Sequence, residues 1–235
     1  MAIRAIFFDA AGTLIKTARP VGEGYASLAR KYGMGVVAEE ITARFRACFS
    51  SAPPLAFPGA RPEELPTLER HWWKDLVRRV FEPYGPFGDF DDYFSDLFRY
   101  FSRADSWALY PETVETLAAL RERGMALDVV SNFDSRLFGI LEGLGIASYF
   151  DSVIISSHAG YAKPAPEIFH KALRLHQLRA QEAAHVGDSP EKDAAGASEA
   201  GLIAILVDRH GGITGDAFPS IRNLKEILGL LEPRD

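Results

Sequence analysis

The amino-acid sequence predicts an α/β protein with a doubly wound parallel sheet and a second, all-α domain inserted into it. Short apolar runs alternate with helical patterns over the C-terminal half, and only helical patterns fill the roughly 90 residues that follow the first apolar run. We expect the strands of the sheet in five runs: Ile3–Phe8, Ala126–Val130, Ser152–Ile155, Ala184–Val186 and Ile203–Val207.

These runs have the composition of buried parallel strands. Several are nearly continuous in apolar residues, and the β-branched residues Val and Ile recur in them. A strand that is covered by helices on both faces needs such a run, whereas a half-exposed strand alternates apolar and polar residues. The sequence therefore predicts a Rossmann-like sheet with helices on both faces.

Helical periodicity separates the runs from the second one onward. Gly124 and Gly145 stand where two of these helices should end, and a third helix is entered through Pro164 and Pro166. The residues that carry the period are Val114, Leu117, Leu120, Leu137, Ile140, Leu141, Leu144, Phe169, Leu173 and Leu175.

The all-α segment is predicted as a separate domain of residues 17–105, which we call the cap. Residues 1–16 and 106–235 form the predicted α/β core. The four cap helices are expected at Val21–Tyr32, Ala38–Phe49, Glu63–Phe81 and Phe90–Arg103. Because ligands of open parallel sheets bind at the carboxyl ends of the strands, a cap that leaves the first strand is expected to act as a lid there.

Composition excludes several classes of function. The chain has 235 residues, and Asp plus Glu outnumber Lys plus Arg by 32 to 26 for a net charge of −6. We therefore expect no nucleic-acid partner. No apolar run approaches the ~18 residues of a membrane span, and Asp9 interrupts the N-terminal run, so we expect neither a membrane segment nor a signal peptide. A single cysteine, Cys48, fits a cytoplasmic protein without an internal disulfide.

Polar residues follow the predicted strands at the ends where a ligand would bind. They lie in four segments: Asp9–Thr13, Ser131–Asp134, Lys163-Pro164 and Gly187–Asp193. Each alone fits a turn or a helix cap, but the carboxyl ends of parallel strands meet at one edge of a sheet. We therefore expect these side chains to form one site.

The four segments resemble the motifs of a known superfamily. They read FFDAAGTL, VVSNFD, AKPAP and HVGDSPEKDAAGA, in that order along the chain. This set is similar to the four motifs of haloacid dehalogenase superfamily hydrolases, and the helical insert matches the cap of that family in position and type. The resemblance spans nearly the whole chain.

The resemblance implies a covalent mechanism. Asp9 would be the nucleophile, and it would form an aspartyl phosphate in the phosphatase branch or an ester in the dehalogenase branch. Ser131 and Lys163 would hold the transferring group, with Asn132 beside them in substrate binding. Thr13 would order the first loop.

The resemblance also implies a magnesium site. Its expected ligands are the carboxylates of Asp9 and Asp188 and the backbone carbonyl of Ala11, with Asp193 orienting bound water. Charge supports this site, because two carboxylates a few ångströms apart repel unless a cation lies between them or one takes up a proton.

The chain departs from the phosphatase pattern at Ala11. Most phosphatases of the superfamily have a second Asp there, which protonates the leaving oxygen and later activates water. Such an acid–base group contributes ~10²–10⁴-fold to the rate. We therefore expect a Mg²⁺-dependent phosphatase of altered or weak activity on a small phosphorylated metabolite, best suited to leaving groups that need little protonation, such as acyl or aryl groups.

Two alternatives stay open. Metal-independent 2-haloacid dehalogenases also lack the second Asp, but they generally carry a neutral residue where this chain has Asp188. They also need a cap arginine for the substrate carboxylate, and we interpret Arg44 and Arg46 as exposed helix charges. The second alternative is a degenerate protein that binds a ligand or a partner without turnover. A monomer and a homodimer are both compatible with the sequence.

Overall fold

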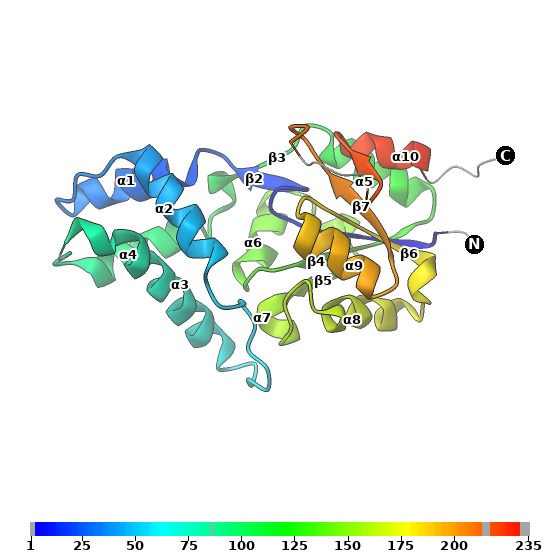
Figure 1. The fold of residues 1–235 in the computed structure, drawn as a ribbon, viewed down its shortest axis with the longest axis horizontal. Helices are drawn as coiled ribbons and strands as arrows, with labels where there is room; N and C mark the ends of the chain where they lie inside the picture. The colour runs from blue at the N-terminus through cyan, green and yellow to red at the C-terminus, as the bar shows by residue number, and fades with distance from the viewer. Residues whose placement is uncertain (1–2, 86, 213–216, 231–235) are drawn as a thin grey trace.

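The computed structural model describes residues 3–85, 87–212 and 217–230. Figure 1 shows two bodies side by side: a sheet with helices on both faces, and a group of four helices labelled α1 to α4. The chain enters the helical group after the first strand of the sheet and returns after α4. The predicted fold class, a parallel α/β sheet with an inserted helical cap, is confirmed.

The central sheet has six parallel strands within the described ranges, in the order β5-β4-β1-β6-β7-β8. They are β1 (Ala5–Phe8), β4 (Ala126–Ser131), β5 (Ser152–Ile155), β6 (Ala183–Gly187), β7 (Ile203–Val207) and β8 (Ser220–Ile221). All five predicted strands are present. The sixth, β8, was not predicted, because two residues are too few to show a pattern.

Helices cover both faces of the sheet (Figure 1). Apolar residues of α5, α6 and α10 pack on one face, and those of α8 and α9 pack on the other. The helices are α5 (Thr113–Glu122), α6 (Arg136–Gly143), α7 (Ser156–Ala159), α8 (Pro166–His176), α9 (Gly196–Glu199) and α10 (Ile227–Leu230). Gly124 and Gly145 follow α5 and α6 with φ of 74° each, as predicted for helix ends.

Two residues of the predicted helical pattern face solvent. Val114 is 43% exposed and Leu175 is 61% exposed, whereas Leu117 and Leu173 are buried. Leu175 follows Leu173 by two residues, which places it on the opposite side of a helix with 3.6 residues per turn, and Val114 lies at the end of its row of apolar residues. The pattern therefore predicted the helices without separating their buried from their exposed members.

The cap has a hydrophobic core of its own, rich in aromatic side chains. Its helices are α1 (Val21–Lys31), α2 (Ala38–Ser50), α3 (Leu65–Phe81) and α4 (Phe90–Tyr100). Tyr25, Ile41, Phe81 and Tyr93 are buried at its centre. Because this cluster is separate from the two that flank the sheet, the cap packs largely on itself.

A short ribbon joins the cap to the sheet. Strand β2 (Ile15–Thr17) pairs antiparallel with β3 (Trp107–Leu109), so both connecting segments are held together. The domain boundaries predicted at 16/17 and 105/106 fall in or beside this ribbon. Strands of three residues carry no readable periodicity, which is why neither was predicted.

Short helical turns complete the described chain. Five are 3-10 turns and one, η5, is a π-helical turn; they are η1 (Glu82–Tyr84), η2 (Ala104–Ser106), η3 (Ala147–Tyr149), η4 (Ala180–Glu182), η5 (Pro190–Ala195) and η6 (Leu224–Glu226). No helix in the described part of the chain is both long enough and apolar enough to cross a bilayer.

Candidate active site

The four predicted segments meet at the carboxyl edge of the sheet. Strand β1 lies between β4 and β6, so Asp9, which follows β1, is flanked by Ser131 at the end of β4 and by Asp188, which follows β6. Lys163 comes from the loop between α7 and α8. The sheet order therefore brings together residues that are more than 100 positions apart in the sequence.

Asp9 is buried and held by two hydrogen-bond donors. The Ser131 hydroxyl donates to Asp9 Oδ1 over 2.9 Å, and Lys163 Nζ donates to the same oxygen over 2.7 Å. Asp9 is 7% exposed and Lys163 is 4% exposed. Both of these side-chain donors bind Oδ1 rather than Oδ2.

Asn132 fixes the loop that carries Lys163. Its side-chain amide donates to the carbonyl oxygen of Lys163 over 2.9 Å, and the backbone N–H of Lys163 donates to Asn132 Oδ1 over 2.7 Å. This reciprocal pair ties the loop after β4 to the loop before α8. Asn132 also borders the cavity above the site.

Asp193 is the second acidic partner of Lys163. Lys163 Nζ donates to Asp193 Oδ1 over 2.5 Å, and the backbone N–H of Ser189 donates to Oδ2 over 2.9 Å. Gly187 permits this approach, because a Cβ atom there would lie 2.1 Å from Asp193 Cγ. Asp193 thus orients the lysine from the turn η5.

His185 also contacts Asp193, and the sequence did not single it out as a site residue. It lies in β6, is buried, and its Nε2 lies 2.9 Å from Asp193 Oδ1. Burial lowers the pKa of His185, which keeps the ring neutral with its Nε2 hydrogen directed at the carboxylate. The sequence signal that could have identified His185 is a histidine inside an otherwise apolar strand.

Gly12 allows the first loop to pass directly beside Asp188. Its φ is +99°, and a Cβ atom at this position would lie 2.3 Å from Asp188 Oδ2. A side chain would therefore be both strained and displaced. The neighbouring Ala11 is exposed to the cleft, where a phosphatase of the pattern described above would carry its acid–base carboxylate.

Arg209 holds the same loop through the backbone of Thr13. Thr13 is fully buried, and its hydroxyl has no hydrogen-bond partner among the described residues. Arg209, which follows β7, donates to the carbonyl oxygen of Thr13 over 2.7 Å and pairs with Glu112 over 2.6 Å. Sequence reasoning missed Arg209, because a single arginine after a strand has no distinctive spacing.

Three carboxylates and one ammonium share this small volume. Oxygen atoms of Asp9, Asp188 and Asp193 all lie within 4.8 Å of one another, and Lys163 is the only cation that ion-pairs with Asp9 and Asp193 in the described structure. If all four groups are ionised, two negative charges are left in excess. An all-oxygen donor set with this excess charge fits a divalent cation such as Mg²⁺.

The pKa values of the acidic groups reflect this crowding. The pKa of Asp188 is raised to about 7. The largest cause is desolvation by the surrounding cleft, and the negative charges of Asp9 and Asp193 add to it, although the residue itself is open to solvent. Burial likewise raises the pKa of Asp9, against the opposing charge of Lys163. Burial alone would raise the pKa of Asp193 too, but Lys163 and His185 outweigh it and hold that pKa below its usual range.

A cavity of about 510 Å³ lies directly above this group, between the core and the cap. Ala11, Gly12, Asn132 and Asp188 contribute to its lining from the core. The rest of the wall is largely aromatic: Tyr25, Phe45, Phe49, Trp73, Phe94, Phe98, Phe101, Trp107 and Phe133. The cap therefore encloses an apolar space over a strongly polar floor.

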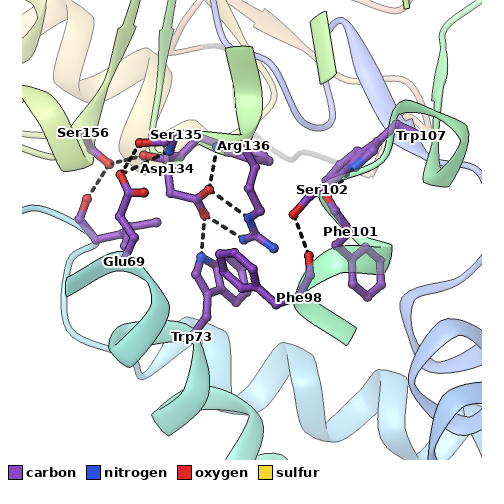
Figure 2. A network of polar contacts seen from close by, with 12 residues as sticks. Glu69, Trp73, Phe98, Phe101, Ser102, Trp107, Asp134, Ser135, Arg136 and Ser156 are labelled. Carbon is purple, nitrogen blue, oxygen red and sulfur yellow. Dashed lines mark hydrogen bonds and ion pairs between the residues drawn. The ribbon is translucent and has the colours of Figure 1, made fainter. Parts of the chain in front are cut away.

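The cap contacts the core through the loop that follows Ser131. Figure 2 shows Trp73 of α3 donating to Asp134 Oδ2 over 2.5 Å, while Glu69 Oε1 accepts hydrogen bonds from the backbone N–H and the hydroxyl of Ser135. Glu69 and Asp134 are both buried. The position of the cap is thus tied to the loop that follows β4.

Comparison with known proteins decides the family. A model of the haloacid dehalogenase-like hydrolase family matches residues 3–201. The chain belongs to this family. The match covers all four motif segments, so their resemblance is confirmed and the protein is a hydrolase of this superfamily.

Individual relatives of this hydrolase differ in activity. A mouse protein, haloacid dehalogenase-like hydrolase domain-containing protein 3, is 40% identical over 98% of this chain and 95% of its own length. The crystal structure of a haloacid dehalogenase (HAD) phosphatase from Thermococcus onnurineus is 26% identical, with a TM-score of 0.67 over 97% of this chain and 98% of its own. A 2-haloacid dehalogenase from Pseudomonas syringae is 25% identical, with the same TM-score and the same coverage of both chains.

The two cap arginines of this hydrolase have different surroundings. Arg44 donates to the carbonyl oxygens of Val80 and Arg79 over 2.7 and 2.9 Å, so it links α2 to α3. Arg46 is exposed and lines the cavity. Arg46 is therefore an exposed charge, as predicted. Arg44 instead has a structural role, because it joins α2 to α3.

Proposed function

We propose that this hydrolase is a Mg²⁺-dependent phosphatase that uses Asp9 as a nucleophile on a small phosphorylated metabolite. The observation that carries the proposal is the position of Asp9, which is held by Ser131 and Lys163 and lies within 4.8 Å of Asp188 and Asp193. A carboxylate in this setting splits phosphate hydrolysis into two easier steps.

In the first step, Asp9 Oδ2 attacks the phosphorus atom. The bond between phosphorus and the leaving oxygen breaks, and the leaving group takes the electron pair. Ser131 and Lys163 keep the carboxylate oriented, and the Lys163 charge also stabilises the negative phosphoryl oxygens. In the second step, water attacks the aspartyl phosphate, which releases inorganic phosphate and restores the carboxylate.

Asp9, Asp188, Asp193 and the carbonyl oxygen of Ala11 are the groups that would hold the metal ion, directly or through water. When bound, Mg²⁺ supplies positive charge to the phosphoryl group and to the crowded carboxylates. Without a cation, burial first and then the negative charge of Asp193 raise the pKa of Asp9 against the opposing charge of Lys163, which disfavours ionisation of the nucleophile.

Ala11 restricts the leaving groups that this site can release. No carboxylate stands at that position to protonate the departing oxygen. A leaving group that is already stable as an anion does not need this proton. We therefore propose that activity is weak on alkyl phosphates and higher on acyl or aryl phosphates.

The proposal is tested with p-nitrophenyl phosphate as substrate. We expect turnover with Mg²⁺, loss of turnover with a chelator, and loss in Asp9→Asn. Asp75→Asn, which makes the same chemical change at an exposed position on the cap, should keep full activity. Turnover that is indifferent to both the metal and Asp9 would refute the proposal.

The same experiment addresses a degenerate, ligand-binding protein. This alternative is motivated by Ala11, since a former enzyme would keep its pocket and lose part of its chemistry. It predicts phosphate-analogue binding without turnover and without an aspartyl intermediate that BeF₃⁻ could mimic or mass spectrometry could detect.

A 2-haloacid dehalogenase is the second candidate. The absence of a carboxylate at position 11 and the similarity to the Pseudomonas syringae dehalogenase favour it. The Asp188 carboxylate, which lies within 4.8 Å of Asp9, opposes it in a metal-free site. Chloride release from 2-chloropropionate in the presence of a chelator would support this candidate, and no halide release from a panel of haloacids would eliminate it.

A further inference from the structure

The cavity above Asp9 has a wall that does not suit a small polar substrate. Phe49 from α2, Trp73 from α3 and Phe98 from α4 face Trp107 and Phe133 from the core across it. A pocket lined by so many aromatic side chains stabilises a ligand mainly through the burial of apolar surface. Its volume of about 510 Å³ is far more than a phosphate group alone would fill.

Of the three basic residues in the wall, Arg46 is exposed to solvent and the other two lie over aromatic rings. The Arg136 guanidinium lies over the rings of Trp73 and Phe98, 4.7 and 4.2 Å from their centroids, and it pairs with buried Asp134 over 2.6 Å (Figure 2). The Asp134 carboxylate therefore neutralises the charge of the guanidinium, and the flat face of the guanidinium extends the aromatic wall. Lys16, at the edge, lies over the Tyr110 ring at 5.2 Å.

The polar floor and the apolar wall border the same cavity. Gly12, Asn132 and Asp188 line the same cavity as Phe49 and Phe98. A phosphate group that is placed at Asp9 would therefore extend its organic part upward among the aromatic rings. The aromatic wall would therefore recognise the leaving group, which is the organic part of the substrate.

We propose that the substrates of this hydrolase are aryl phosphates, whose ring lies in the aromatic wall formed by the cap. This inference rests on the phosphatase function proposed above and specifies its substrate class. It also accounts for Ala11, because both the wall and the missing acid select for the same leaving group.

The leaving-group chemistry follows from acidity. A phenol with a pKa of ~10, like the tyrosine side chain, departs as an anion far more readily than an alkoxide, whose parent alcohol has a pKa near the ~15.7 of water. Attack by Asp9 on phosphorus breaks the P–O(aryl) bond and releases a phenolate, which takes its proton from solvent. Water then cleaves the aspartyl phosphate, so no acid at position 11 is needed in the first step.

The test measures binding separately from turnover. Phenylphosphonate and methylphosphonate are titrated into the Mg²⁺-loaded protein by calorimetry, because neither has a leaving group. We expect phenylphosphonate to bind at least about 10-fold more tightly, owing to burial of its ring. Equal affinities would overturn the proposal.

Three variants test whether the aromatic wall causes the preference for phenylphosphonate over methylphosphonate. Phe49→Ala removes part of the wall and Val21→Trp fills the cavity from α1, so each should bring the affinity ratio close to one. Phe138→Ala removes an aromatic ring from α6 that is 40% exposed and outside the cavity, so it should leave the ratio unchanged. A ratio that survives both wall variants, with folding confirmed by circular dichroism, would also overturn the proposal.

Hydrolysis of acetyl phosphate distinguishes a failure of the proposed phosphatase function from a failure of the aryl assignment. It has a good leaving group and no ring, so the proposed phosphatase should hydrolyse it through Asp9. If Asp9→Asn does not reduce this turnover, the proposed function fails. If Asp9→Asn abolishes the turnover while the phosphonates bind equally, the phosphatase function stands and the aryl assignment alone is wrong.

Discussion

The indole nitrogen of Trp73 donates a 2.5 Å hydrogen bond to Oδ2 of Asp134, three residues after Ser131 in the chain. One partner belongs to the cap and the other to the core, and Asp134 is fully buried. Arg136 donates to both oxygens of the same carboxylate. The cap is therefore anchored on a buried ion pair in the loop that follows β4.

Because Trp73 anchors the cap, we expect Trp73→Phe and Trp72→Phe to lower the stability of the protein by different amounts. Trp73→Phe removes a hydrogen bond to a buried, charged carboxylate, a class that contributes about 1.5–3 kcal/mol. Trp72→Phe removes a bond to the exposed carbonyl oxygen of Pro53 and serves as the matched control. Urea unfolding should show the larger loss of stability for Trp73→Phe, and equal losses would contradict the role of Trp73 as an anchor.

Lys163→Met should reduce turnover by a factor of about 10² or more, because the site loses the one cation that pairs with Asp9 and with Asp193. Lys171→Met is the control, since Lys171 donates to the carbonyl oxygen of Ala159 and makes no ion pair with the carboxylates of the site in the described structure. Steady-state rates on p-nitrophenyl phosphate measure both variants. Near-normal activity of Lys163→Met would remove the lysine from the proposed mechanism.

Gly12→Ala should weaken the response to Mg²⁺, because the new methyl group would displace the Asp188 carboxylate. We expect the Mg²⁺ concentration for half-maximal activity to rise about 10-fold or more, as for other groups that orient metal ligands. Gly33→Ala has a comparable positive φ of 76° but open space around it, so it reproduces the backbone strain without the contact. A similar metal response in both variants would exclude the steric explanation.

Ala11→Asp should raise activity on alkyl phosphates by restoring an acid at the leaving oxygen. A positioned acid–base group contributes ~10²–10⁴-fold, so even imperfect placement should give a measurable gain. Ala11→Asn has nearly the same size and cannot transfer a proton, and it should show no gain. If both variants stay inactive with the fold and the metal response intact, the missing acid is not what limits the enzyme.

Asp151 gives a pH-dependent contribution to stability. Partial burial alone would raise its pKa, but hydrogen bonds from Arg121 over 2.7 Å and from the backbone N–H of Leu127 over 3.0 Å outweigh this and lower it. The folded pKa thus lies below the unfolded value of ~3.9. The stabilisation is present above that value and is lost as the pH falls through the folded pKa.

The melting temperature of Asp151→Asn checks this sign. The gap between wild type and variant should be widest near neutral pH and should close as the solution becomes strongly acidic. Arg121→Met should show a similar pattern, because it removes the main partner of the same carboxylate. A gap that widens in acid would reverse the assignment.

Much of the core fold follows from local sequence. Runs such as Ile203–Val207 are long and apolar enough to identify buried parallel strands, and Gly124 and Gly145 mark two helix ends. Strands β2, β3 and β8 escaped prediction, because two or three residues show no period.

The sequence by itself determined the kinds of candidate catalytic group and their order along the chain, because Asp9, Ser131, Lys163 and Asp188 each stand where a strand or its loop must end. Only the tertiary structure decided their surroundings. The bond from Arg209 to the first loop and the aromatic wall of the cavity both join distant segments. Local propensities carry no information on such contacts, which arise only when the sheet order and the cap bring those segments together.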